Sequence, residues 1–291
     1  MSIFKQNFIK NFKLFVKQVM IVFFNDAAVD IELVLDSIRL WELEKKSVAL
    51  RAAHCWQYCT KALIPTLIRF FNHLGDNNFG RDLLIEEMQV ACYKILNALY
   101  PLGTAKHHFV RHMKLKEFPL DIMETMEQLL EKNRSAFGEC LAALASCFPV
   151  AFLEPKLNRF NPVSVYNALS IKDRQILGLP TRIEKLAENL PILKNLTRDI
   201  EDLAISGARY DDAPEMIDVI LPLICSYVPA WLEYGPEGKP EGTVCCTEIG
   251  VKHANDTLGN VLRLIYNNLG TEEAQWMKLI ANYTQVLFCP N

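Results

Sequence analysis

Leu258-Gly-Asn-Val-Leu-Arg-Leu-Ile-Tyr-Asn-Asn-Leu269 is the stretch that decides the fold class of this chain. Its apolar residues recur every three or four positions, which is the spacing of one face of an α-helix. They are Leu258, Val261, Leu262, Ile265 and Leu269. A half-buried strand would instead place apolar residues at every second position. The stretch therefore predicts an amphipathic helix that buries this stripe.

The same period recurs in three earlier stretches of the chain. Their apolar stripes are Ile85, Met88, Cys92, Ile95, Leu96 and Leu99; then Leu193, Leu196, Ile200, Leu203 and Ala204; then Met216, Ile220, Leu223, Ile224 and Tyr227. Strand-type alternation does not run for more than a few residues anywhere in the sequence. We therefore expect an all-α protein without a sheet.

Glycine and proline residues divide these helices. Asp212, Pro214 and Glu215 form a helix start, because proline already has the helical φ and the acidic side chains can cap free backbone amides. The segment from Gly235 to Cys246 opens as a Pro/Gly-rich loop. Short breaks between helices predict hairpins stacked in series, an armadillo- or HEAT-like α-solenoid over residues 1–291. A compact helical bundle is the alternative.

Composition excludes several classes of function. The 291 residues carry a net charge of -3, so no overall positive field exists to hold a nucleic acid backbone. The longest nearly apolar run, Leu141 to Leu153, is shorter than the roughly 20 residues of a membrane span. Residues 1–24 combine Phe and Lys at helical spacing, which favours a surface helix or repeat packing over a membrane anchor.

The nine cysteines indicate a reducing compartment. Their number is odd and their spacing is not that of a disulfide framework. Four N-glycosylation sequons point the other way, but such triplets are common by chance and two of them fall within helical patterns. They begin at Asn133, Asn195, Asn255 and Asn282. We expect the cytosol.

Candidate metal sites are incomplete. The segment from Asp76 to Glu87 has the length of a calcium-binding loop, but Arg81 occupies the position that requires glycine. His108 and His112 are spaced to place two imidazoles on one helical face, yet no further ligand stands at a known zinc spacing. We predict no bound metal and no cofactor.

Candidate nucleophiles are also incomplete. His54 and Cys55 are adjacent and Cys59 follows one turn later, but the apolar neighbours of these residues are typical of a core helix. Cys245 and Cys246 are adjacent without the two-residue spacer of zinc and redox motifs, so only a role as an oxidation-sensitive spot stays open. We predict that the chain is not an enzyme and has no catalytic residues.

Several long stretches resemble the ryanodine receptor family of intracellular calcium-release channels. The resemblance covers about residues 23–287, and residues 113–131 have no counterpart in it. It rests on Phe23–Ala28, Phe79–Tyr93, Leu102–Thr104, Ala136–Leu141, Pro149–Glu154, Ser164–Tyr166, Ile176–Pro180, Ser206–Tyr210, Leu221–Tyr227 and Leu258–Lys278.

The resemblance implies a section of the cytoplasmic bridging solenoid of such a channel. Its expected role is to transmit movement between the peripheral domains and the pore-coupled core. The implied partners are other domains and subunits of a homotetrameric channel, together with regulatory proteins. The implied location is the cytoplasmic face of the endoplasmic or sarcoplasmic reticulum. The family's pore and ligand-binding residues have no counterparts in this chain. A stand-alone helical-repeat adaptor is the alternative function.

Overall fold

The computed structural model describes a large part of the chain in separate ranges. They are residues 19–35, 56–76, 87–104, 120–147, 153–154, 156–157, 170–176, 190–207, 212–239, 241–245 and 247–268. Within these ranges 84% of the residues are helical and no strand occurs. The prediction of a mostly helical protein is confirmed for the described residues.

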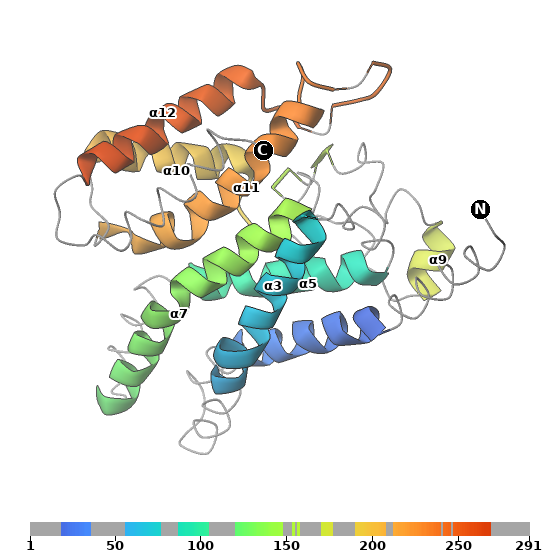
Figure 1. The fold of residues 1–291 in the computed structure, drawn as a ribbon, viewed down its shortest axis with the longest axis vertical. Helices are drawn as coiled ribbons and strands as arrows, with labels where there is room; N and C mark the ends of the chain where they lie inside the picture. Colours follow the sequence, from blue (N-terminus) through green and yellow to red (C-terminus); the bar gives the residue numbers. More distant parts are fainter. Residues whose placement is uncertain are drawn as a thin grey trace.

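The described elements are helices joined by turns (Figure 1). In chain order they are a helix over residues 19–35, η1 (Cys59–Leu63), α3 (Ile64–Asp76), α5 (Glu87–Gly103), α7 (Leu120–Cys147), α9 (Ile171–Ile176), α10 (Leu193–Ser206), η6 (Met216–Ile220), α11 (Leu221–Tyr234) and α12 (Val251–Asn267). The elements η1 and η6 are π-helical turns that lead directly into α3 and α11. Residues 113–131 are the segment that we expected to be an insertion, and residues 120–131 of it belong to α7.

Two of the predicted stripes are confirmed in full or nearly so. On α10, Leu193, Leu196, Ile200 and Ala204 are buried and Leu203 is partly buried. The helix ends where Gly207 takes a left-handed φ of 71°, a conformation that glycine adopts without steric cost. The predicted stripe of η6 and α11, from Met216 to Tyr227, is also buried.

The predicted stripe of α12 is confirmed at Val261, which is buried, and at Ile265 and Leu258, which are partly buried, but it is wrong at Leu262. The last member of the predicted stripe, Leu269, lies outside the described residues. The buried residues of this helix are Ala254, Thr257, Val261 and Leu264, whereas Leu262 is 49% exposed. Small and polar side chains lie on the face that α12 turns toward α10 and α11. Thr257 can be buried there because its hydroxyl donates a hydrogen bond to the carbonyl of His253 within the same helix. A hydrophobicity pattern alone gives such residues little weight.

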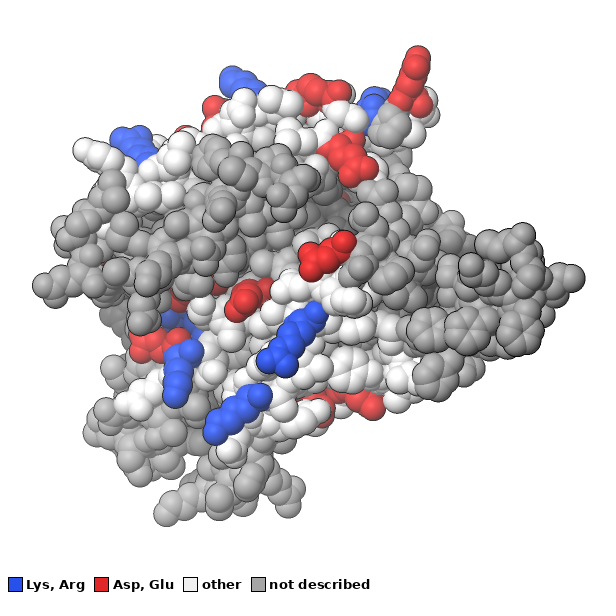
Figure 2. Space-filling model, viewed as in Figure 1, with Lys and Arg blue, Asp and Glu red and all other residues white. Residues whose placement is uncertain are grey.

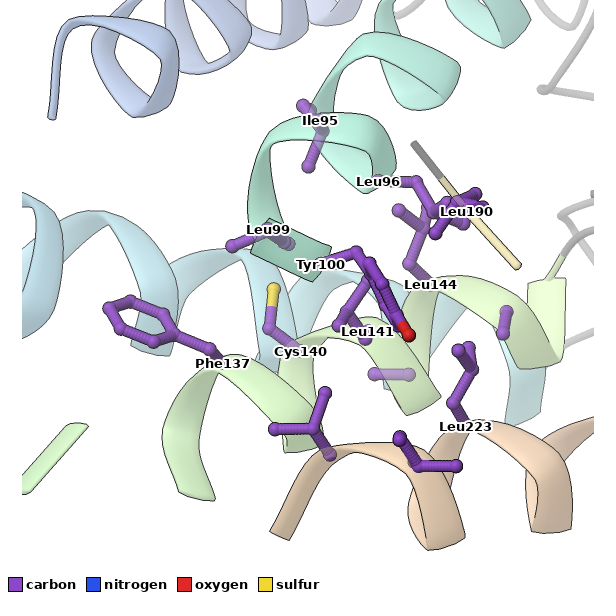
Figure 3. Close-up of a cluster of buried hydrophobic side chains, with 14 of the residues drawn as sticks. Ile95, Leu96, Leu99, Tyr100, Phe137, Cys140, Leu141, Leu144, Leu190 and Leu223 are labelled. Carbon is purple, nitrogen blue, oxygen red and sulfur yellow. The ribbon is translucent and has the colours of Figure 1, made fainter. Parts of the chain in front are cut away.

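The central element is α7, which packs against α3, α5, η6 and α11. In Figure 1, the helix over residues 19–35, α3 and α5 lie toward one side of α7, and α10, α11 and α12 lie toward the other. Side chains of α5 and α11 meet those of α7 in the core (Figure 3). The labelled side chains are Ile95, Leu96, Leu99, Tyr100, Phe137, Cys140, Leu141, Leu144, Leu190 and Leu223.

Aromatic rings join the first helices to this core. Phe24 stacks on Phe71 of α3 with ring centroids 5.6 Å apart and planes inclined by 2°. Trp56 meets Phe137 of α7 edge to face at 6.1 Å. All four rings are nearly inaccessible to solvent. Since each aromatic pair adds about 0.5–1.5 kcal/mol beyond the burial of its area, these contacts fix the helix over residues 19–35 and α3 against the centre.

Two helical segments approach each other closely at Gly138 of α7. A Cβ atom added at this position would overlap the backbone carbonyl of Asp218 in η6 and would lie 2.9 Å from the Cα of Val219. Gly103, at the end of α5, also packs against Val219. A Cβ added at Gly103 would lie 2.9 Å from a methyl group of the Val219 side chain. Backbone cannot move aside as the end of a flexible side chain can. The absence of a side chain at Gly138 therefore sets the distance between α7 and η6.

Gly138→Ala should destabilise the protein by about 1–3 kcal/mol, because the added methyl forces α7 and η6 apart. Chemical denaturation followed by far-UV circular dichroism measures this change. Gly259→Ala is the matched control, since nothing lies within 4 Å of a Cβ at this position in α12. The control should be neutral or slightly stabilising. Equal stability of the two variants would contradict the assigned packing.

Candidate functional site

Several of the candidate residues lie outside the described part of the chain. These are His54, Cys55, His108, His112, Cys246 and residues 77–86 of the calcium-like loop. Among the residues that the structure does describe, no three His, Cys, Asp or Glu side chains are grouped so that they could hold a metal ion.

The described thiols lie mainly in the core. Burial raises the pKa of Cys140 and Cys92 well above the ordinary value and raises the pKa of Cys225 to about 12. Cys147 is partly buried and its pKa rises to about 11, again mainly through desolvation. The thiolate is the nucleophilic form of cysteine, so these residues are chemically inert near neutral pH. Cys245 is more accessible, in the loop after α11.

Alkylation of the folded protein with iodoacetamide at pH 8 should modify Cys245 well before Cys140 and Cys225. The buried thiols are neutral and shielded, whereas Cys245 reaches solvent. Peptide mapping by mass spectrometry after timed quenching gives the rate for each residue. The three rates should converge when the chain is unfolded in denaturant. Rapid modification of Cys140 in the folded chain would contradict the described core.

One groove on the described surface lies where α10, the end of α5 and the start of the helix containing η6 meet. We call it the acidic groove, and its volume is about 1020 Å³. Three carboxylates line it, from Asp199, Asp202 and Glu215, and its apolar surface includes Leu203 and Met216. The three carboxylates come from two segments that are separate in the sequence, so only the fold brings them together.

Tyr100 of α5 closes one side of the acidic groove. Its pKa is raised, first by burial and then by the negative charges of Asp199 and Glu215. These two charges therefore act on the same hydroxyl from different helices. A field of one sign across a groove favours positively charged ligands over neutral or anionic ones.

The second groove runs between α10 and α12 and has a volume of about 590 Å³. Its charged residues are of both signs and include Lys194, Arg198, Glu201 and Asp256. His253 Nε2 lies 3.0 Å from the hydroxyl of Thr197. Because that hydroxyl donates to the carbonyl of Lys194 at 3.1 Å, His253 must donate through an Nε2–H. This groove contains a structural hydrogen bond between helices and no nucleophile with its base.

The pKa of His253 is lowered from 6.5, chiefly by partial burial and also by Lys194, while Asp256 and Glu201 oppose the shift. The unfolded chain therefore takes up a proton at this residue at a higher pH than the folded chain does. Stability from the neutral ring is present above pH 6.5 and is lost as the pH falls through the folded-state pKa.

His253→Gln should reduce the loss of stability on acidification below pH 6.5, because glutamine keeps an N–H donor but does not titrate. Urea denaturation of the wild type and the variant at a series of pH values measures the difference. The two curves should lie close together near neutrality and separate as the pH falls below 6.5, where the wild type loses more stability. A parallel pH dependence in both proteins would contradict the assigned role of His253.

Surface charge on the described residues is mixed. On the face seen in Figure 2, both basic and acidic side chains are present, and several Lys and Arg side chains in its lower part have Asp and Glu side chains near them.

The comparison with protein-family models gives no match to this sequence. Within the described ranges, no helix combines the length and the apolar character needed to cross a bilayer.

The acidic groove is the feature that sequence reasoning missed. Asp199 and Asp202 stand at i and i+3, so their position on one face of a helix could have been noticed. Their convergence with Glu215 and Tyr100 could not, because it depends on how α5 and η6 pack beside α10.

Proposed function

We propose that this chain is a section of the cytoplasmic solenoid of a ryanodine-receptor-type calcium-release channel and acts there as a mechanical scaffold. In this proposal its helices are stacked hairpins of an armadillo- or HEAT-like array, on the cytoplasmic face of the endoplasmic or sarcoplasmic reticulum. Its partners are other domains and subunits of a homotetramer, together with regulatory proteins. The proposal assigns it no pore, no catalytic residue and no cofactor.

The observation that supports this proposal best is the packing of α7 against elements from both halves of the chain. The helix contacts α3 and α5 on the N-terminal side and η6 and α11 on the C-terminal side. At Gly138 the contact is between backbones, so a displacement of η6 cannot be absorbed by side-chain rearrangement alone. Closely packed interiors transmit strain, which is the property required of a lever. The sequence resemblance supplies the identity of the assembly.

A chain tagged at its own genomic locus tests the proposal in the cells that express it. Detergent-solubilised reticulum membranes are fractionated by size and assayed for ryanodine binding. The tagged chain should elute with the ryanodine-binding fractions as part of a large complex. Elution as a small protein without ryanodine binding would contradict the proposal.

The Gly138→Ala variant extends this experiment to function. It should reduce ryanodine-sensitive calcium release from membrane vesicles relative to Gly259→Ala, since only the first substitution disturbs the contact of α7 with η6. Calcium release that is equal in the two variants would contradict a mechanical role for this packing.

A stand-alone protein-interaction adaptor is the second candidate function. The acidic groove favours it, because a large open groove with apolar and charged walls is suited to binding a peptide. The fractionation experiment separates the two candidates, since an adaptor would not elute with ryanodine-binding fractions.

A further inference from the structure

The acidic groove combines negative charge with an apolar floor. Leu190, Met216 and Ile220 are almost fully buried and form part of its base, and Leu203 of α10 is only partly buried. Asp199, Asp202 and Glu215 stand among these residues. None of the described residues that line the groove is Lys or Arg. The described lining of the site therefore offers apolar contact and negative charge together.

The carboxylates have the spacing that suits a helical ligand. Asp199, Asp202 and Ser206 follow one face of α10 at i, i+3 and i+7, which spans about 10 Å along the helix axis. A helix lying beside α10 presents its own side chains at the same spacing. Glu215 and Tyr100 stand on the other walls of the groove, so the ligand is contacted from more than one side.

We propose that the acidic groove binds a basic amphipathic helix of a partner protein. The apolar face of the helix covers Leu203 and Met216, and its Lys or Arg side chains face Asp199, Asp202 and Glu215. Charge complementarity decides the occupant, because nucleic acids and anionic lipid surfaces would be repelled by the same carboxylates. This inference goes beyond the scaffold role and holds whether the chain acts inside a channel or alone.

The geometry of α10 provides a matched control. Glu201 lies on the same helix, one residue before Asp202, but it lines the α10–α12 groove instead. Both side chains are exposed. Glu201→Gln and Asp202→Asn therefore each remove one negative charge, the first from the α10–α12 groove and the second from the acidic groove. A general effect of net charge would appear in both variants, and a site-specific effect only in the second.

Fluorescence anisotropy with the full chain tests the proposal. The probe is a fluorescein-labelled synthetic peptide of about 15 residues, in which Leu and Lys follow helical spacing. The wild type should bind it, and binding should weaken with added NaCl. The triple variant, which combines Asp199→Asn, Asp202→Asn and Glu215→Gln, should bind the peptide about tenfold more weakly, because it loses three partly exposed charge contacts. Glu201→Gln should leave binding unchanged.

Three results would overturn the proposal. They are equal binding by the wild type and the triple variant, equal binding of a scrambled peptide of the same composition, and tight binding of a Leu/Glu peptide. Far-UV circular dichroism and thermal midpoints verify that each variant is folded. If the triple variant does not fold, the comparison of Asp202→Asn with Glu201→Gln decides the question, with about a twofold or greater loss expected only for the former.

Analytical ultracentrifugation tests the other possible occupant of the acidic groove, which is a second copy of this chain. The wild type should stay at one oligomeric state whether or not Asp202 is substituted. A monomer–dimer equilibrium that shifts with Asp202→Asn and excludes the peptide would assign the groove to self-association and overturn the partner helix. If the peptide does not bind, the prediction that the chain elutes with ryanodine-binding fractions still stands. The peptide-binding proposal and the channel-scaffold proposal can therefore be contradicted separately.

Discussion

The backbone contact between α7 and η6 is the constraint on which the rest of the structure depends. It exists because Gly138 has no side chain at the point where the carbonyl of Asp218 approaches α7. Glycine inside a helix costs roughly 0.5–1 kcal/mol relative to alanine, so it is retained where a close approach compensates for the loss. Val219 continues the same contact toward Gly103 of α5. Three helical segments thus meet around one small residue.

This junction connects the two halves of the described structure. On one side, Phe24 stacks on Phe71 of α3, and Trp56 meets Phe137 of α7. On the other side, η6 leads directly into α11, which contacts α10 and α12. The acidic groove lies where α5, α10 and the start of the η6 helix meet. A ligand in the groove would therefore press on helices that converge near the junction.

The sequence predicted the helices better than it predicted their contacts. Residues such as Leu196 and Ile200 are buried as their period predicted. The stripe of α12 was wrong at Leu262, because Ala254 and Thr257 face the neighbouring helices despite their low hydrophobicity.

The contact at Gly138 and the acidic groove could not be predicted from the sequence. A glycine within a helical pattern indicates only a weaker helix until its neighbour is known. Likewise, Tyr100, Asp202 and Glu215 come together only after α5, α10 and η6 have packed. Both features depend on contacts between residues far apart in the chain, which periodicity does not encode.

Hydrogen–deuterium exchange on the wild type and Gly138→Ala tests the central claim most directly. If α7 joins both halves, the substitution should accelerate amide exchange in α3 and α5 as well as in η6 and α11, as one cooperative unit. Acceleration confined to the residues around 138 and 218, with α3 and α5 unchanged, would contradict the account.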